Sequence, residues 1–152
     1  MEIVQHKLQD FGYLCISDLY TKKELGSIKN EIKNLNYIMD TVPDVQKKRD
    51  ATSDKNEDGS PKMTGNGIPI DNLYSTRAYS AILSFNRKIF VDPIASKMAE
   101  THPSNVAFKR LNDDYSLLNR YSSGDEYLTH FDVSSFSAVT FFSVGRNKVL
   151  GG

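Results

Sequence analysis

The stretch Asn119–Asp132, NRYSSGDEYLTHFD, decides how this chain is interpreted. It places a histidine, His130, and a carboxylate, Asp132, two residues apart, shortly after a glycine-containing turn. Because side chains on a β-strand alternate between its two faces, His130 and Asp132 point to the same side. An imidazole and a carboxylate are two of the three ligands in the 2-His-1-carboxylate set that holds non-haem Fe(II). The residue types alone leave a second interpretation open, in which the two side chains hydrogen-bond each other or the backbone at a strand edge.

Length and composition indicate an ordinary globular protein with one domain. The chain has 152 residues, of which 39% are apolar and 25% are charged. Basic and acidic residues balance at 19 each, so the overall charge does not indicate a nucleic-acid partner. No apolar run is long enough to predict a transmembrane helix, and the polar N-terminus does not resemble a signal peptide. We therefore expect a cytoplasmic protein without membrane contact.

The N-terminal part is predicted to contain a strand followed by a helix. The apolar run Gly12–Ile16 is a predicted strand, and the apolar neighbours of Cys15, the only cysteine, predict a buried and inert thiol. Thr21 stands three residues before Glu24, which is a capping-box spacing. Apolar residues follow at helical spacing and predict a helix over 22–36.

The rest of the chain changes from polar loop to helix and then to strand. The polar stretch 43–67 predicts a loop, which is either solvated and disordered or a lid over a substrate. Apolar spacing predicts helices over 78–100. Aromatic and β-branched residues predict strands over 105–121 and a core strand over 137–143. This order indicates an α+β fold, with helices packed on a mainly antiparallel sheet.

The residues before His130 resemble a known motif. Tyr121 stands nine residues before the histidine, Tyr127 stands three before it, and Gly124 lies between them, while Asn119 precedes Tyr121 by two. This pattern resembles the proximal metal motif of the Fe(II)/2-oxoglutarate-dependent oxygenases, especially the prolyl-4-hydroxylase-like branch. The Asn-x-Tyr pair is also similar to that of the DNA-repair dioxygenases in the same superfamily. The resemblance implies the first half of a double-stranded β-helix, or jelly roll.

The resemblance also implies a role for each residue. His130 and Asp132 would be ligands of Fe(II). Tyr121 would donate a hydrogen bond from its phenol to a carboxylate of the co-substrate 2-oxoglutarate, with Asn119 as a second donor. Tyr127 would lie near the co-substrate and the substrate entrance. Packing in a core or on a sheet face is the alternative for both tyrosines, and no residue is assigned to a catalytic proton transfer.

The resemblance covers only the first half of the family's barrel. The family's distal histidine, and the lysine or arginine that pairs with the far carboxylate of 2-oxoglutarate, have no counterpart after Gly151–Gly152. We therefore expect an Fe(II)- and 2-oxoglutarate-dependent oxygenase, hydroxylase-like, or an apparently truncated N-terminal fragment of one that is inactive as this chain. The alternative is a non-catalytic binding or interaction module that retains the half-barrel.

Half of a barrel also has consequences for assembly. It exposes strand edges, so we expect a homo-oligomer joined through the exposed C-terminal strands. The substrate class stays open among protein prolines, free amino acids, nucleobases and small metabolites, because selectivity resides in loops and lids.

Overall fold

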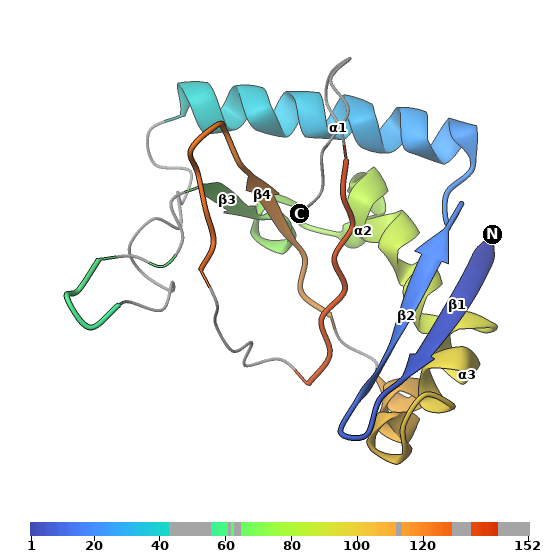
Figure 1. Cartoon of the computed structure of the whole chain (residues 1–152). Helices are drawn as coiled ribbons and strands as arrows, with labels where there is room; N and C mark the ends of the chain where they lie inside the picture. Colours follow the sequence, from blue (N-terminus) through green and yellow to red (C-terminus); the bar gives the residue numbers. More distant parts are fainter. Residues whose placement is uncertain (43–55, 61, 63–64, 112–113, 129–134, 143–152) are drawn as a thin grey trace.

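Helices and antiparallel strand pairs make up the molecule, which confirms the predicted α+β class. The structure is a computed structural model that describes residues 1–42, 56–60, 62, 65–111, 114–128 and 135–142. In these ranges the strands form two separate two-stranded antiparallel sheets, β1–β2 and β3–β4 (Figure 1). The elements in chain order are β1 Glu2–Lys7, β2 Gly12–Ser17, α1 Lys22–Thr41, β3 Asn66–Pro69, η1 Ile70–Leu73, η2 Arg77–Tyr79, α2 Ala81–Asn86, η3 Arg87–Phe90, α3 Ile94–Ala99, η4 Pro103–Arg110 and β4 Leu117–Arg120.

The long helix α1 begins at the predicted capping box. The side chain of Thr21 accepts a hydrogen bond from the backbone N–H of Glu24, and the Glu24 carboxylate accepts one from the N–H of Thr21. These reciprocal bonds satisfy two of the backbone donors that the first turn of a helix leaves unpaired. The helix continues to Thr41, five residues beyond the predicted end.

The main core lies between α1, α2 and the segment that runs from β3 into η1. Figure 1 shows α1 lying across α2 and the β3–β4 pair. Four residues of α1 and two each of α2 and the β3–η1 segment form one buried cluster: Ile28, Ile32, Leu35, Met39, Ile82, Leu83, Ile68 and Ile70. Burying an aliphatic side chain of this size stabilises the folded state by about 1.5–3 kcal/mol relative to its exposure. This cluster fixes the β3–β4 pair beneath α1.

The N-terminal strand β1 was not predicted. It pairs with β2 over its whole length, with Glu2 opposite Ser17 and Lys7 opposite Gly12. One face of this hairpin contacts α3, where the Gln5 side chain donates to the backbone oxygen of Lys97 over 2.9 Å.

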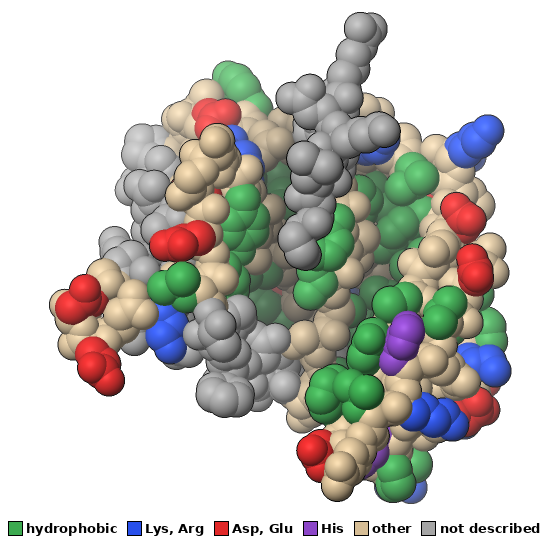
Figure 2. All heavy atoms as spheres, in the orientation of Figure 1, with side chains coloured by type: hydrophobic (Ala, Val, Ile, Leu, Met, Phe, Trp, Pro, Cys, Tyr) green, Lys and Arg blue, Asp and Glu red, His purple; other side chains and the backbone are tan. Residues whose placement is uncertain are grey.

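The opposite face of the hairpin is open to solvent. Figure 2 shows apolar side chains gathered there, and Val4, Phe11 and Tyr13 are among the exposed ones. Cys15 also lies exposed on this face, opposite Val4, so its prediction as a buried thiol was wrong. The reason is the two-residue period of a strand, which turns Leu14 towards the other face and Cys15 outward.

Residues 105–110 form a helix and not the predicted strand. The 3₁₀-helix η4 begins with Pro103 at its first position, and the ring of His102 accepts a hydrogen bond from the N–H of Ser104. Its buried residues, Asn105 and Phe108, are three positions apart. This spacing matches the period of a 3₁₀-helix, in which residues three apart share a face.

Residues 137–142 were predicted to form a core strand together with Ser143, and the described part of this segment has no strand. The ring of Phe136 stands edge-on to Phe108, with centroids 5.1 Å apart, and that of Phe142 stacks on Tyr20 at 6.3 Å. The segment is anchored by these two rings, while Val139 and Phe141 are 74% and 82% exposed.

Two further predictions need boundaries corrected. The predicted loop 43–67 includes the start of β3 at Asn66, and its residues 43–55 lie outside the described ones. The helical region predicted over 78–100 is divided into α2, α3 and short 3₁₀ turns.

Candidate functional site

Strand β4 presents Asn119 on the face of its sheet that points away from α1. Leu118 packs against the core under α1, and the guanidinium of Arg120 donates a hydrogen bond to Asp40 of α1 over 2.8 Å. Side chains alternate along a strand, so Asn119 faces the opposite way, and Tyr121 continues the same face. The structure therefore places two of the predicted co-substrate residues on one face.

The position across from Asn119 carries no side chain. β3 pairs antiparallel with β4, and Gly67 is the register partner of Asn119. Residues directly opposite each other in an antiparallel pair share a face of the sheet. Main chain, and not a competing side chain, therefore lies across from the amide of Asn119.

The amide of Asn119 also has an unsatisfied acceptor. Its Oδ1 atom is buried and accepts no hydrogen bond from the described part of the chain. Buried polar atoms in folded proteins nearly always have a partner, from the protein, from water or from a ligand. Because Oδ1 is an acceptor, its partner has to be a hydrogen-bond donor.

A tight turn at Ser122–Asp125 follows β4, as predicted. The N–H of Asp125 donates to the backbone oxygen of Ser122 over 3.0 Å, and the N–H of Ser122 donates to Oδ2 of Asp125 over 2.7 Å. Gly124 has a φ of +88°, a conformation that glycine adopts without steric cost. The turn reverses the chain immediately after Tyr121.

This reversal brings Tyr127 near Tyr121. Both side chains are partly exposed, at 45% for Tyr121 and 41% for Tyr127. Burial raises the pKa of Tyr121, and the neighbouring Tyr127 phenol and Asp125 carboxylate raise this pKa further. The hydroxyl of Tyr121 therefore stays protonated near neutral pH and can act as a hydrogen-bond donor.

The predicted metal ligands, His130 and Asp132, lie outside the residues that the structure describes. Within the described ranges, no group of three or more His, Cys, Asp or Glu side chains is placed to hold a metal ion. The structure thus places Tyr127 near Tyr121, which follows Asn119 by two residues, and the metal pair stays a prediction from sequence.

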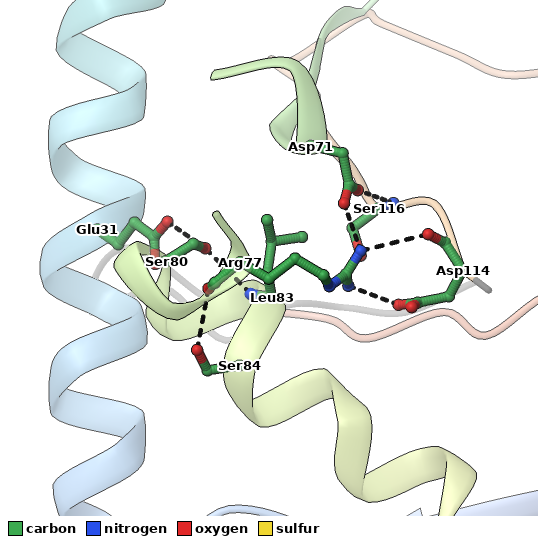
Figure 3. Close-up of polar contacts among 8 residues, drawn as sticks. All are labelled: Glu31, Asp71, Arg77, Ser80, Leu83, Ser84, Asp114 and Ser116. Carbon is green, nitrogen blue, oxygen red and sulfur yellow. Dashed lines mark hydrogen bonds and ion pairs between the residues drawn. The ribbon is translucent and has the colours of Figure 1, made fainter. Parts of the chain in front are cut away.

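An ion-pair network that sequence analysis did not identify holds the start of β4 in place (Figure 3). Arg77 pairs through Nη1 with Asp71 of η1 and through Nη2 with Asp114 at 2.7 Å. The second oxygen of Asp71 accepts a hydrogen bond from the backbone N–H of Ser116 over 2.7 Å. Since Ser116 directly precedes β4, this network fixes where the strand begins.

A second polar cluster joins α1 to α2 (Figure 3). The carboxylate of Glu31 accepts hydrogen bonds from the hydroxyl of Ser80 over 2.6 Å and from the N–H of Ile82 over 2.9 Å. Burial, and then the hydrogen bond and charge of Glu31, raise the pKa of Tyr74. The cluster anchors the first turn of α2 on α1. It thereby supports the core that lies between α1 and the β3–β4 sheet, whose opposite face, carrying Asn119, is called the candidate face below.

One signal in the sequence could have identified the second cluster. Glu31 lies within the apolar stripe of α1, next to Ile32 and three residues after Ile28. A carboxylate on the buried stripe of a helix requires partners, because an unpaired buried charge is costly. The partners of Arg77 give no such signal, since Asp71 and Asp114 are far apart in the chain and follow no periodic pattern.

In comparisons with known proteins, no family model, no curated protein and no solved structure matches this chain. The interpretation of the site therefore depends on the residues and the geometry given above. Among the described helices, none has the length and apolar character needed to cross a membrane.

Proposed function

We propose that this chain is an Fe(II)- and 2-oxoglutarate-dependent oxygenase, or a part of one, built on the first half of a double-stranded β-helix. The observation that carries the proposal is the placement of Asn119 on the antiparallel strand β4 and of Tyr121 directly after its end, followed by a tight turn. This geometry leads directly into the His130-x-Asp132 pair. The resemblance in sequence requires this order of strand, turn and metal motif.

The residues of the face fit the proposed ligands. Iron and 2-oxoglutarate, when bound, supply the activation of dioxygen, and His130 and Asp132 would hold the iron. The phenol of Tyr121 would donate a hydrogen bond to a carboxylate of 2-oxoglutarate, and the Asn119 amide would orient the same group. The Asn119 amide would do so through its Nδ2 donor, because the buried Oδ1, an acceptor with no partner in the described chain, cannot bind another acceptor such as a carboxylate. Tyr127, a neighbour of Tyr121, would lie near the co-substrate and the substrate entrance.

Manganese binding tests the proposal. Mn(II) substitutes for Fe(II) in sites made of imidazole, carboxylate and water, and its free form gives a resolved spin-resonance signal. We expect the protein to bind Mn(II) weakly, 2-oxoglutarate to tighten the binding, and Asp132→Ala to abolish it, because a lone imidazole has little affinity for a hard cation. Mn(II) affinity that is unchanged in Asp132→Ala would overturn the assignment of the metal site.

The role of Tyr121 is tested in the same titration. Loss of a hydrogen bond to a charged group costs about 1.5–3 kcal/mol, so Tyr121→Phe should weaken the 2-oxoglutarate effect by roughly tenfold or more. Tyr79→Phe is the matched control, since Tyr79 is 74% exposed and lies in η2, outside the candidate face. Binding of 2-oxoglutarate that requires no metal would instead favour a non-catalytic binding module.

We also propose that copies of the chain associate through the segment 135–142. Val139 and Phe141 are 74% and 82% exposed there. The stretch from Val133 to Val144 contains no charged residue, and exposed apolar patches often mark sites of protein–protein contact. A second copy that covers this segment would remove these apolar side chains from water.

A further inference from the structure

The described residues of β3 and the segment before it place a second glycine beside the candidate face. Asn66 is the register partner of Arg120, so Gly65 comes opposite Tyr121 when the pairing is continued by one residue. With Gly67 opposite Asn119, a glycine faces each of the two predicted co-substrate residues. A strand interior normally disfavours glycine, and glycine there often marks a close approach of another group.

At Gly65 the approaching group is the ring of Tyr121. A Cβ atom added at Gly65 would lie 3.0 Å from Cδ1 and 3.1 Å from Cε1 of the Tyr121 ring. It would also lie 2.8 Å from the backbone oxygen of Arg120. Real Cβ atoms essentially never approach other atoms closer than 3.0 Å, so any side chain at this position would displace the ring, the strand or both. Gly65 is itself buried, because the ring lies over it.

We infer that Gly65 is a positioning residue: because it has no Cβ, one edge of the Tyr121 ring can lie against the backbone just before β3, and this contact fixes the direction of the Tyr121 hydroxyl. The inference about ligand binding rests on the proposed function, whereas the packing of the ring on Gly65 does not. Residue 65 then controls the co-substrate site without touching the co-substrate. It accounts for a glycine at this buried position.

The position of the ring is measured first. Tyrosine labelled with ¹³C at Cζ gives one resonance per ring, and Tyr121→Phe identifies that of Tyr121. We expect Gly65→Ala to shift this resonance, while Gly26→Ala leaves it in place, since a Cβ added at Gly26 of α1 meets nothing within 4 Å. An unshifted Tyr121 resonance in folded Gly65→Ala would overturn the inference.

A second measurement does not depend on the folding of Gly65→Ala. In the wild-type protein the Tyr121 ring should shift the Hα resonances of Gly65 by its ring current, and Tyr121→Leu should return them to ordinary values. Gly26 of α1 is the internal reference in the same spectra, since a Cβ atom added there would meet nothing within 4 Å. Unchanged Gly65 resonances in Tyr121→Leu would show that the ring does not lie on Gly65.

Ligand binding then separates this inference from the proposed function. Gly65→Ala should weaken the 2-oxoglutarate effect by about tenfold, as loss of one hydrogen bond to a charged group predicts, and leave the affinity for Mn(II) alone unchanged. If 2-oxoglutarate had no effect on Mn(II) binding by the wild-type protein, the proposed function would be refuted. The two resonance measurements would still show whether the Tyr121 ring packs on Gly65. A wild-type protein that responds to 2-oxoglutarate, together with an equal response of Gly65→Ala, would refute the positioning role.

Discussion

The guanidinium of Arg77 donates a hydrogen bond to the carboxylate of Asp114 over 2.7 Å, across 37 positions of sequence. The same guanidinium pairs with Asp71, which in turn accepts from the N–H of Ser116. One cation thus balances two carboxylates that would otherwise repel each other at the entrance to β4. The candidate face depends on this contact, because β4 begins at the next residue after Ser116.

Replacement of Arg77 should therefore destabilise the fold. Arg77→Met leaves Asp71 and Asp114 close together and largely withdrawn from water, with side chains 18% and 14% exposed. We expect a loss of about 1–3 kcal/mol in the free energy of unfolding, less than for a fully buried pair. Urea denaturation followed by circular dichroism measures this loss. Arg87→Met removes the same charge from an exposed position, and an equally large loss in that control would contradict the prediction.

Replacement of Gly12 in the β1–β2 hairpin should also destabilise the fold. A Cβ atom added at Gly12 would lie 2.4 Å from Cβ of Thr101, and the backbone oxygen of Gly12 accepts a hydrogen bond from Asn105 over 3.3 Å. Gly12→Ala should cost about 1–3 kcal/mol through overpacking. Gly26→Ala is the matched control and should stabilise α1 by about 0.5–1 kcal/mol. Thermal denaturation of the two variants should give melting temperatures that move in opposite directions from the wild type.

The ion pair at the start of α1 predicts a pH dependence. The hydrogen bond from Lys88 lowers the pKa of Glu24, and the N–H of Thr21 lowers it further. A carboxyl whose pKa is lower in the folded state stabilises that state above its unfolded pKa of about 4.3 and loses this contribution as the pH falls through the folded value.

Lys88→Met tests this dependence. Its melting temperature should lie below that of the wild type at pH 6, and the gap should shrink as the pH falls from about 5 to 3. Lys97→Met removes a charge from a more exposed and longer ion pair, at 3.9 Å, and should show a smaller change in its gap. A gap for Lys88→Met that stays constant with pH would mean that Glu24 is not stabilised by Lys88.

Two substitutions in the segment 135–142 should have different effects, one on stability and the other on self-association. Phe136 packs on Phe108, so Phe136→Ala should lower the free energy of unfolding by about 1–2 kcal/mol. Phe141 is 82% exposed, so Phe141→Ala should leave the stability of the monomer unchanged and weaken self-association. Analytical ultracentrifugation at micromolar concentration measures the second effect. A wild-type chain that sediments as a monomer throughout this range would refute the proposed homo-oligomer.

The sequence predicted correctly those features that form between residues close together in the chain. The Thr21–Glu24 capping box and the turn at Ser122–Asp125 each involve residues within three positions of one another, and both are confirmed. β1 was missed because its mixed polar sequence gains a strand partner only through pairing with β2. The error over 105–110 has a similar cause. The few apolar residues of this segment fit both the two-residue period of a strand and the three-residue period of a 3₁₀-helix. Contacts with α3 and Phe136 favour the helix there.

The sequence suggested which residues form the candidate site, but it did not reveal the contacts that hold them in place. Asn119 and Tyr121 were named from their resemblance to a family motif, and the structure adds that the strand period turns Asn119 away from α1. The contact between Tyr121 and Gly65 depends on a strand pairing across more than fifty residues, which no spacing within the chain reveals. His130 and Asp132 stay predictions, because they lie outside the described residues.

The exposed position of Cys15 gives the protein a ready attachment point for a probe. It is the only thiol in the sequence and lies on the open face of β2. A maleimide dye or a nitroxide will therefore react at a single site without removal of other cysteines. The sequence also has no tryptophan, so an intrinsic indole signal will not obscure the emission of an attached fluorophore. A second cysteine introduced at Phe141 would allow the distance from the hairpin to the C-terminal segment to be measured in solution.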